Sequence, residues 1–313
     1  MSRPEPSQLP RDAFEQASTG GGALVCLENR FGIRVTGSDA ERYLSGQLTN
    51  DLALTTSETA VYTCVTNAKG KLEADAWVRR ESDGSFLIDA DSSLRGTLPA
   101  RLERYAIADD VEFAEVDLPE LWHVTGIPTD LPDDAIKAKR FGLAGIDLAG
   151  VPTGATAELP RLDTNQADAL RIIQGLPAWG AELTDGLLPP EAGIESIAVS
   201  YDKGCYIGQE VISRMRRAGK TNRILVYLVS SYSPGACFDL PASLAGLSIL
   251  DSTGQSVGEV TSSTIHPILD RWVALAYVKT RSLASEPSQF AIEGPDSRKP
   301  SPFEQKPAPY TER

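Results

Sequence analysis

The stretch KGCYIGQEVISRMRRAGK, residues 203–220, sets one cysteine, Cys205, among glycines, lysines and arginines. The chain around it is acidic, with 43 Asp and Glu against 30 Lys and Arg and a formal net charge of −13. The pattern predicts a turn, the cysteine and a helix from about Gln209 to Arg217 that ends at a glycine. An apolar strand from Ile197 to Tyr201 is expected to lead into the turn.

Two features of this stretch favour a thiolate at Cys205. Unpaired N–H groups at a helix N-terminus carry partial positive charge, and Lys203 lies two residues away. The remaining cations suit the helix C-terminus and can also face an anionic ligand: Arg214, Arg216, Arg217, Lys220 and Arg223. A second interpretation stays open, in which Cys205 is a small structural side chain and the arginines only offset the helix dipole.

Composition excludes several classes of protein. The chain has 313 residues, 41% of them hydrophobic, which is enough for a sizeable core and roughly two domains. With only His123 and His266, neither a Ser-His-Asp triad, nor a Cys-His dyad, nor a histidine metal centre is expected. The acidic balance argues against direct nucleic-acid binding. Without a signal sequence or an apolar run of the ~18 residues that a membrane span needs, the sequence predicts a cytoplasmic protein with no membrane partner.

The cysteines lie far apart in the sequence, at Cys26, Cys64, Cys205 and Cys237. None forms a CxxC pair, so no metal site is predicted, and disulfides are not expected in the cytosol. The three cysteines outside the quoted stretch stand in apolar, strand-like surroundings, where we expect them to be inert.

Periodicity and turn residues predict an α+β chain in four parts. Residues 1–22, rich in proline and then glycine, are expected to form a flexible N-terminal arm. Residues 23–223 are predicted to be a mixed α and β region, with a β-rich subdomain near residues 118–162. Short strands broken by glycine and aspartate turns predict a small antiparallel β-barrel over residues 224–294. Residues 295–313 are predicted to be a Pro-rich tail.

Several elements are predicted inside the mixed region. A strand is expected at Ala23–Leu27, another at Ile33–Thr36, and a helix from Ala40. Alternation around NAKGK predicts a β-hairpin over Ala60–Arg80. A helix is expected from Asn165 to Gly175, with Thr164 as its cap.

The string KGCYIGQE, followed by an arginine and a glycine, resembles the signature of the YgfZ family of folate-binding proteins. These proteins are relatives of the glycine cleavage T-protein, an aminomethyltransferase, and act in maintaining iron–sulfur clusters. Further segments match in the same order and cover most of residues 33–280: VTGSDAERYLSGQLTND, NAKGKLEAD, LRIIQGLPAWGAEL, LPPEAGI, VGEVTSS and ALAYVK.

The resemblance implies three subdomains around a central folate-binding hole, with tetrahydrofolate or a one-carbon derivative as cofactor. It implies an accessory protein of iron–sulfur cluster assembly or repair, and thereby of the maturation of iron–sulfur enzymes such as tRNA-modifying ones. Its partners would be folate and iron–sulfur assembly or client proteins. Tetrahydrofolate ends in one or more glutamates, so a local cluster of cations would suit its anionic end.

Carried over by position, the resemblance implies a reactive Cys205 with Lys203 beside it as the catalytic residues. The implied folate-binding residues are Asn50, Asp51, Asp75, Arg171, Glu191, Tyr206, Gly208, Gln209, Glu210, Arg214 and Arg223. Structural alternatives stay open for several of them. Asn50 and Asp51 can be turn formers and Glu191 a cap. Arg171 can pair with a buried carboxylate, and Tyr206 and Trp77 can be packing residues.

Two positions depart from the T-protein pattern. Of the acidic pair in its glycine hairpin one carboxylate remains, Asp75, beside Ala74. The glutamate that grips the pterin two residues after the arginine is replaced here by Ile173, so pterin recognition is weaker, differently arranged or absent. Three hypotheses therefore remain: the folate-binding accessory protein, an active aminomethyltransferase, and a non-catalytic binding scaffold with a structural Cys205.

Overall fold

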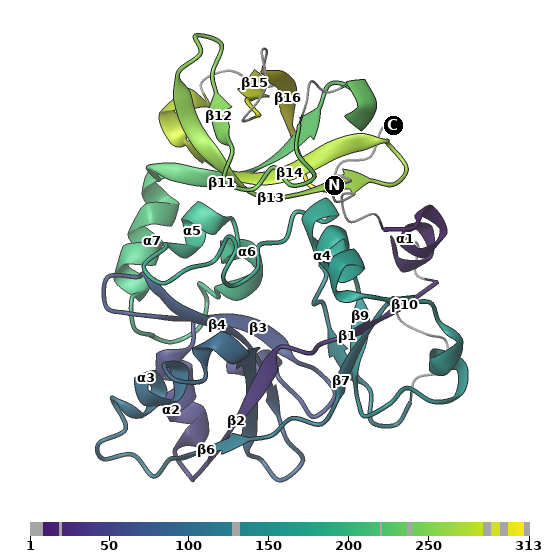
Figure 1. The fold of residues 1–313 in the computed structure, drawn as a ribbon. Helices are drawn as coiled ribbons and strands as arrows, with labels where there is room; N and C mark the ends of the chain where they lie inside the picture. Colours follow the sequence, from purple (N-terminus) through teal and green to yellow (C-terminus); the bar gives the residue numbers. More distant parts are fainter. Residues whose placement is uncertain are drawn as a thin grey trace.

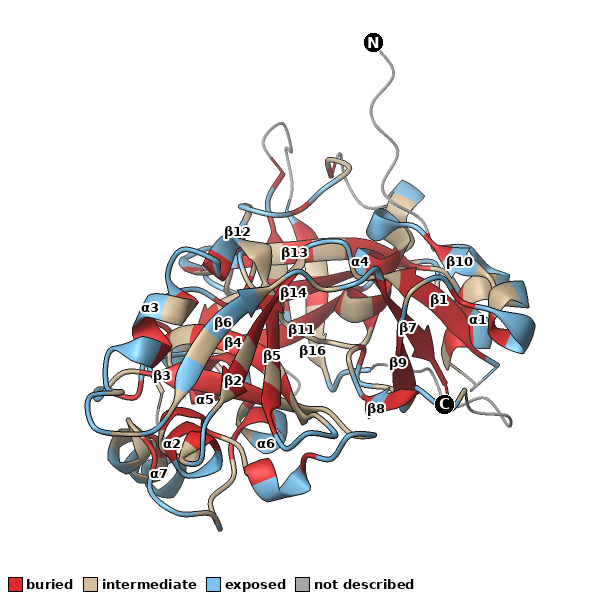
Figure 2. Ribbon diagram, turned by 90° about the horizontal axis from the view of Figure 1, so that it is seen from below, coloured by how far each residue is buried: buried red, intermediate tan, exposed pale blue. Residues whose placement is uncertain are grey.

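The computed structural model describes residues 9–18, 21–126, 132–219, 221–236, 240–283, 289–294 and 300–309. They form two five-stranded sheets and a closed barrel, with the barrel above both sheets in Figure 1. Figure 2 shows that the buried residues concentrate in the strands of all three assemblies, while the edge strand β6 is largely exposed. The predicted α+β class and C-terminal antiparallel barrel are confirmed.

The first sheet has the order β3-β4-β5-β2-β6. Its strands are β2 (Arg30–Thr36), β3 (Val61–Thr66), β4 (Leu72–Arg80), β5 (Phe86–Asp91) and β6 (Glu112–Val116). Alternate apolar residues, such as Ala74, Ala76 and Val78 of β4, pack on one face with α2 (Ala40–Gln47) and α3 (Leu98–Glu103). Asp75 and Trp77 therefore point to the opposite face.

The second sheet has the order β10-β1-β7-β9-β8. Its strands are β1 (Ala23–Cys26), β7 (Leu121–Thr125), β8 (Ile136–Ala138), β9 (Gly145–Ala149) and β10 (Arg161–Leu162). The region near residues 118–162 thus forms sheet, and β1 joins it from far upstream. Part of the predicted flexible arm instead forms helix α1 (Arg11–Ser18). Its Phe14 and Ala17 share one apolar face, and this face is buried against the core.

Helix α4 (Thr164–Ile173) lies between the second sheet and the barrel (Figure 1) and shares a hydrophobic core with both. Asp163, rather than the expected Thr164, caps it, accepting a hydrogen bond of 2.8 Å from the Gln166 N–H. Packing of α4 in one core with both assemblies positions the segment that follows it.

The barrel is closed by six antiparallel strands. They are β11 (Arg223–Ser230), β12 (Ser248–Leu250), β13 (Ser256–His266), β14 (Arg271–Lys279), β15 (Gln289–Ile292) and β16 (Ser301–Lys306). The barrel therefore extends past the predicted boundary at residue 294. The prolines around β16 suggest a tail, but this strand pairs with both β11 and β15 and so removes two open sheet edges. Short 3₁₀ helices lie at Leu52–Leu54, Ser92–Leu94, Gly154–Glu158, Pro234–Ala236 and Thr280–Ser282.

Three helices connect the first sheet to the barrel: α5 (Pro189–Ala192), α6 (Glu195–Ala198) and α7 (Gln209–Ala218). The predicted strand Ile197–Tyr201 is wrong. The Ile197 and Ala198 N–H groups bond to the Ile194 carbonyl, and the following residues pair with no strand. The predicted helix is confirmed as α7, and Gly219 ends it in a left-handed conformation. No helix among the described residues is long and apolar enough to cross a membrane.

Candidate functional site

A cavity of about 740 Å³ lies where β3 and β4 of the first sheet face β8 and β9 of the second. The end of α4, the connection after it, and α6 with the residue before it complete its wall. Aromatic side chains line much of it: Tyr62, Trp77, Phe141 and Trp179. Of the residues implied for folate, Asp75 and Arg171 line this cavity.

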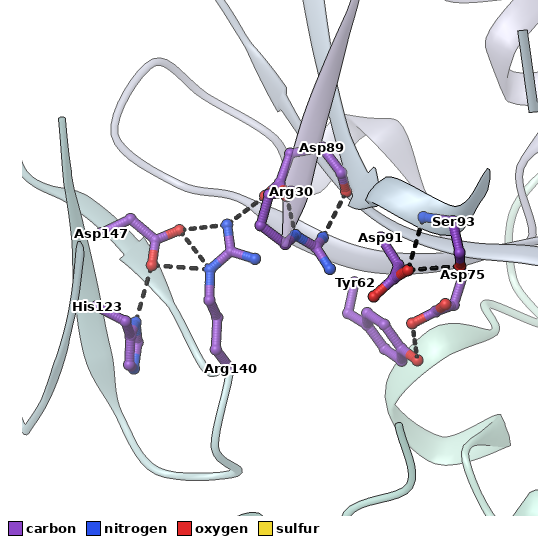
Figure 3. Close-up of polar contacts among 9 residues, drawn as sticks. All are labelled: Arg30, Tyr62, Asp75, Asp89, Asp91, Ser93, His123, Arg140 and Asp147. Carbon is purple, nitrogen blue, oxygen red and sulfur yellow. Dashed lines mark hydrogen bonds and ion pairs between the residues drawn. The ribbon is translucent and has the colours of Figure 1, made fainter. Parts of the chain in front are cut away.

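Asp75 is a buried carboxylate with one oxygen left over. Its Oδ2 accepts a hydrogen bond of 2.9 Å from the Tyr62 hydroxyl (Figure 3), while the buried Oδ1 has no partner among the described residues. Burial raises the pKa of Asp75, and the Arg30 charge opposes this. A buried polar atom without a partner is costly, and this oxygen can accept a hydrogen bond from a group in the cavity.

A chain of buried charges joins the two sheets beside the cavity (Figure 3). Arg140 bonds to both oxygens of Asp147, at 2.9 and 2.8 Å from Nε, and also to Asp89. Asp89 accepts in turn from Arg30, and the His123 Nδ1 lies 2.8 Å from Asp147. The guanidinium of Arg140 also stacks on the Trp77 ring, 5.1 Å from its centroid, so the network fixes an aromatic wall of the cavity.

The neighbouring charges in this network keep its two aspartates ionised. Burial would raise the pKa of Asp147 and of Asp89, but the neighbouring arginines hold both below the ordinary range. Burial also lowers the pKa of His123. No motif in the sequence predicts this network. A signal existed in charged residues placed among apolar strand neighbours, such as Asp89 in FLIDA and Asp147 in GIDLA.

Arg171 is held by protein partners as well as lining the cavity. Its Nη1 donates to the buried Glu182 at 2.9 Å, its Nη2 to Ser262 at 3.0 Å and its Nε to Asp168 at 2.6 Å. The alternative of pairing with a buried carboxylate is therefore what the structure shows. Ile173, at the position of the T-protein's pterin-binding glutamate, is fully buried in the core around α4 and does not line the cavity.

Lys203 fastens the KGCYIGQE motif to the first sheet's helix α2. Its Nζ donates to the carbonyl oxygens of Ser45, Leu48 and Asn50, at 2.7, 2.8 and 2.9 Å. Burial lowers the pKa of Lys203 to about 8. With its three donors bound to three backbone carbonyls, Lys203 holds the C-terminal end of α2 as a clamp.

Asn50 and Asp51 also serve the local backbone. The Asn50 amide donates to the Tyr62 and Ile197 carbonyls, at 2.8 and 3.0 Å, and the Asp51 carboxylate accepts from the Ala53 N–H at 3.0 Å. Neither residue lines the cavity. Their arrangement matches the turn-forming alternative.

Gly208 brings the motif into contact with the hairpin turn NAKGK. It has a φ of +90°, and a Cβ there would lie 2.6 Å from the Asn67 carbonyl oxygen and 2.9 Å from the Gly70 Cα. Gln209 begins α7 directly after it, and Tyr206 is buried against Ile212 with its hydroxyl unpartnered among the described residues. The KGCYIGQE motif and the NAKGK turn therefore contact each other through their backbones.

Cys205 is exposed and lies outside the cavity lining, four residues before α7 begins. Glu210 and Arg214 form an exposed ion pair on α7. Glu191 lies 3.5 Å from the Nε of Arg223, whose guanidinium stacks on Tyr277. Lys220 and Cys237 fall outside the described residues. Of the implied site residues, the structure therefore brings only Asp75 and Arg171 into the cavity, and the others lie outside its lining.

Metal ligands are not gathered anywhere in the part of the chain that the structure describes: no group of three or more His, Cys, Asp or Glu residues is arranged to hold an ion.

A family model and a solved structure both match this chain. Residues 236–306 match the family described as the glycine cleavage T-protein C-terminal barrel domain. The crystal structure of aminomethyltransferase T from Bartonella henselae superimposes with a TM-score of 0.76, covering 95% of this chain and 89% of that one at 19% identity. The fold is therefore that of the glycine cleavage T-protein.

Curated sequences narrow the class further. The chain is 30% identical over 274 residues to the human mitochondrial iron–sulfur cluster assembly factor IBA57, covering 77% of this chain and 75% of that protein. It is 28% identical over 232 residues to the tRNA-modifying protein YgfZ of Cronobacter sakazakii, covering 66% of this chain and 70% of that protein. The chain belongs to the YgfZ-like family, which confirms the resemblance drawn from its motifs.

Proposed function

We propose that this chain binds tetrahydrofolate, or a one-carbon derivative, in the central cavity and acts as an accessory protein of iron–sulfur cluster assembly or repair. Through that role it supports the maturation of iron–sulfur enzymes, among them enzymes that modify tRNA. The observation that carries the proposal is the orphaned Asp75 Oδ1 inside an aromatic-walled cavity. Its relatives include an iron–sulfur cluster assembly factor, IBA57, and a tRNA-modifying protein, YgfZ, which supports the second half of the proposal.

The cavity residues fit a folate. A volume of about 740 Å³ lies within the ~300–1,000 Å³ usual for small-molecule sites. The Trp77, Trp179 and Tyr62 rings offer surfaces for the pterin and benzoyl rings. A pterin carries both N–H donors and acceptors, so Asp75 finds a partner on it in either protonation state. Cationic side chains elsewhere in the lining suit the carboxylates of the glutamate.

Cys205 suits a protein partner better than the folate, because its thiol is exposed and lies outside the cavity lining. Iron–sulfur clusters are held by roughly four Cys thiolates. Cys64 is buried in β3 and Cys26 half-buried in β1 of the other sheet. A thiolate at Cys205 would therefore act as one ligand in a transient complex whose other ligands come from an assembly or client protein.

The test of the folate half is a tryptophan-fluorescence titration of the full chain with tetrahydrofolate. Asp75→Asn keeps the side-chain shape but removes the carboxylate, and we expect about tenfold weaker binding. Cys205→Ser is the matched variant outside the cavity, and its affinity should equal that of the wild type. No binding by the wild type would reject folate as the cofactor.

The test of the iron–sulfur half uses the same two variants in cells that lack the endogenous protein. Activity of an iron–sulfur tRNA-modifying enzyme is measured. Cys205→Ser should fail to restore it while still binding folate, and Asp75→Asn should restore it only in part. Full restoration by Cys205→Ser would make the cysteine structural and favour the scaffold hypothesis.

An aminomethyltransferase activity is the second candidate, because Asp75 stands in the cavity of a T-protein fold. The buried Ile173, which replaces the pterin-binding glutamate, opposes it. A glycine cleavage assay with lipoylated carrier protein separates the two. We expect no aminomethyl transfer, and turnover would favour this second candidate.

A further inference from the structure

Helix α7 places three arginines next to the Cys205 motif. Positions 214 and 217 lie one helical turn apart, and the Arg214 side chain is 67% exposed. Arg217 is also exposed, and Arg216 stacks on the Tyr201 ring with its Cζ 3.8 Å from the centroid. The solvent side of α7 is therefore basic.

The β3–β4 turn adds two lysines at the start of α7. A Cβ at Gly70 would lie 3.1 Å from the Val211 Cβ and 3.2 Å from the Ile212 Cγ1, so this turn packs directly on the helix. Lys69 and Lys71 flank the glycine, and both are exposed. They extend the basic surface past the N-terminal end of α7.

The rim of the barrel adds two more cations at the end of α7. The Thr280 N–H donates to the Asn222 carbonyl at 3.0 Å, which joins the end of β14 to the segment that follows the helix. Lys279 and Arg281 flank Thr280, and both are exposed. Figure 1 shows α7 running between the β3–β4 hairpin and the barrel, so cations from three parts of the chain line up along it.

Residues 67–71, 209–219, 221–223 and 279–281 together form a surface that we call the α7 strip. Its cations are Lys69, Lys71, Arg214, Arg216, Arg217, Arg223, Lys279 and Arg281. Glu210 is the one acidic residue of these segments, and it pairs with Arg214 at 2.7 Å. The helix itself makes the strip about 15 Å long. On a chain of net charge −13, the α7 strip is thus a local reversal of charge.

The exposed Cys205 lies at the N-terminal end of the α7 strip. The Ile207 N–H donates to the Gly46 carbonyl at 3.0 Å, and Lys203 is bound to the end of α2, so the chain is anchored on both sides of the cysteine. A Cβ at Gly204 or at Gly46 would meet nothing within 4 Å among the described residues. Another molecule can therefore approach the thiol closely.

We infer that the α7 strip is the docking surface for a protein partner with an acidic contact face, and that this partner reaches Cys205 along the helix. The inference rests on the proposed iron–sulfur function, in which the other ligands of a cluster come from such a partner. Complementary charge along the strip raises the association rate and fixes the orientation in which the partner meets the thiol. A nucleic acid fits less well, because a chain of net charge −13 repels a dense row of phosphates.

The experiment uses the Cys205 thiol as its reporter. The probe is a helical peptide of about 15 residues whose single cysteine is held in a mixed disulfide with thionitrobenzoate. The Cys205 thiolate attacks the peptide sulfur, forms a disulfide with it and releases thionitrobenzoate, whose absorbance gives the rate. Peptides with Glu, Gln or Lys at the same exposed positions react with the full chain carrying Cys26→Ser and Cys237→Ser, since Cys64 is buried. At about 0.02 M salt we expect the glutamate peptide to react about tenfold faster than the glutamine peptide, and the lysine peptide more slowly than either.

Two double variants each neutralise one end of the strip: Lys69→Gln with Lys71→Gln, and Lys279→Gln with Arg281→Gln. The matched control is Arg11→Gln with Arg161→Gln, two exposed cations on α1 and β10, across the molecule from α7 in Figure 1. Each strip variant should lose about threefold of the preference for the glutamate peptide, and the control should keep it. Equal rates with the glutamine peptide in all proteins would show that the thiol itself is unchanged.

Failure of the docking surface and failure of the iron–sulfur function give different results. Equal rates for the three peptides, or a preference that persists in both strip variants, would overturn the docking surface and leave the iron–sulfur proposal standing. A wild-type chain that does not restore the iron–sulfur enzyme in cells would overturn that proposal and this inference together. Retention of bulk tRNA at about 0.15 M salt by the wild type, but not by the strip variants, would assign the strip to a nucleic acid and reject the protein partner. Strip variants that lose the peptide preference and also restore the enzyme less well than the control support the docking surface.

Discussion

Lys203 connects a sequence motif to the fold through one side chain. Its ammonium group has three donors, and each is directed at a backbone carbonyl, those of Ser45 and Leu48 at the end of α2 and that of Asn50. With its donors occupied in this way, Lys203 is placed as a clamp rather than as a proton donor to a ligand. The resemblance implied a catalytic role, for which this geometry leaves no free donor.

Replacing Lys203 with Met tests the clamp. The methionine keeps the length of the stem but leaves three carbonyl oxygens without their partner, so the free energy of unfolding should fall by about 2 kcal/mol. Urea unfolding measures it, with the exposed Lys69→Met as the control that should change little. Unchanged stability together with lost cellular function would instead make Lys203 a functional group.

Asp75 and Arg171 illustrate what sequence reasoning reached at single positions. Both were carried over from motifs, and both line the cavity. The sequence could not show that Arg171 is bound to Glu182, because that pairing depends on how the chain folds back after α4. It also missed Arg140, which pairs with Asp89 of the other sheet, and Asp147, which pairs with Arg140 and His123. Motifs mark positions, whereas contacts between assemblies require the packed structure.

The contact between α7 and the β3–β4 hairpin depends on two glycines. Gly208 and Gly70 both have positive φ, and the Gly208 carbonyl oxygen would lie 3.3 Å from a Cβ at Gly70. The Thr66 hydroxyl bonds to the Ile207 carbonyl at 2.6 Å and strengthens the same contact. The motif around Cys205 is therefore held by close backbone packing, so that the thiol is presented on a rigid support.

Gly208→Ala should disrupt this support. The new Cβ would meet the Asn67 carbonyl oxygen at 2.6 Å in a backbone conformation that alanine disfavours, so we expect a loss of about 3 kcal/mol. Gly204→Ala lies in the same motif with nothing within 4 Å of its Cβ and should be close to neutral. Thermal unfolding of both variants gives the comparison, and equal effects would contradict the packing argument.

Local pattern predicted some elements well and others poorly, for physical reasons. Helix α7 was predicted because its glycine termini and one-sided apolar face are encoded within a dozen residues. The Ile197–Tyr201 strand was wrong because an apolar run becomes a strand only if a partner strand is available. β16 was missed because its pairing with β11 and β15 outweighs the local proline signal. Closure of a barrel is a property of the whole chain.

Both histidines of the chain lie where assemblies meet. His266 of the barrel packs edge-on against Phe14 of α1, with ring centroids 5.0 Å apart. His123 belongs to the charge network between the two sheets. Burial lowers the pKa of each, that of His266 to about 4. Protonation therefore acts on contacts that hold the whole molecule together.

Stability should fall as the pH drops from about 6.5 toward 4. A histidine in the unfolded chain has a pKa of ~6.5, above the value of each buried ring, so the unfolded state binds more protons in this range. Each such proton contributes up to about 1.4 kcal/mol per pH unit to the slope. Asp75 acts in the opposite direction, because burial raises its pKa and its protonation relieves a buried charge.

His266→Asn isolates one contribution, since an amide oxygen can replace Nδ1 as acceptor for the Ile268 and Leu269 N–H groups. In urea unfolding at pH 7, 6 and 5, this variant should lose less stability on acidification than the wild type, and parallel curves for the two proteins would show that His266 does not titrate on unfolding.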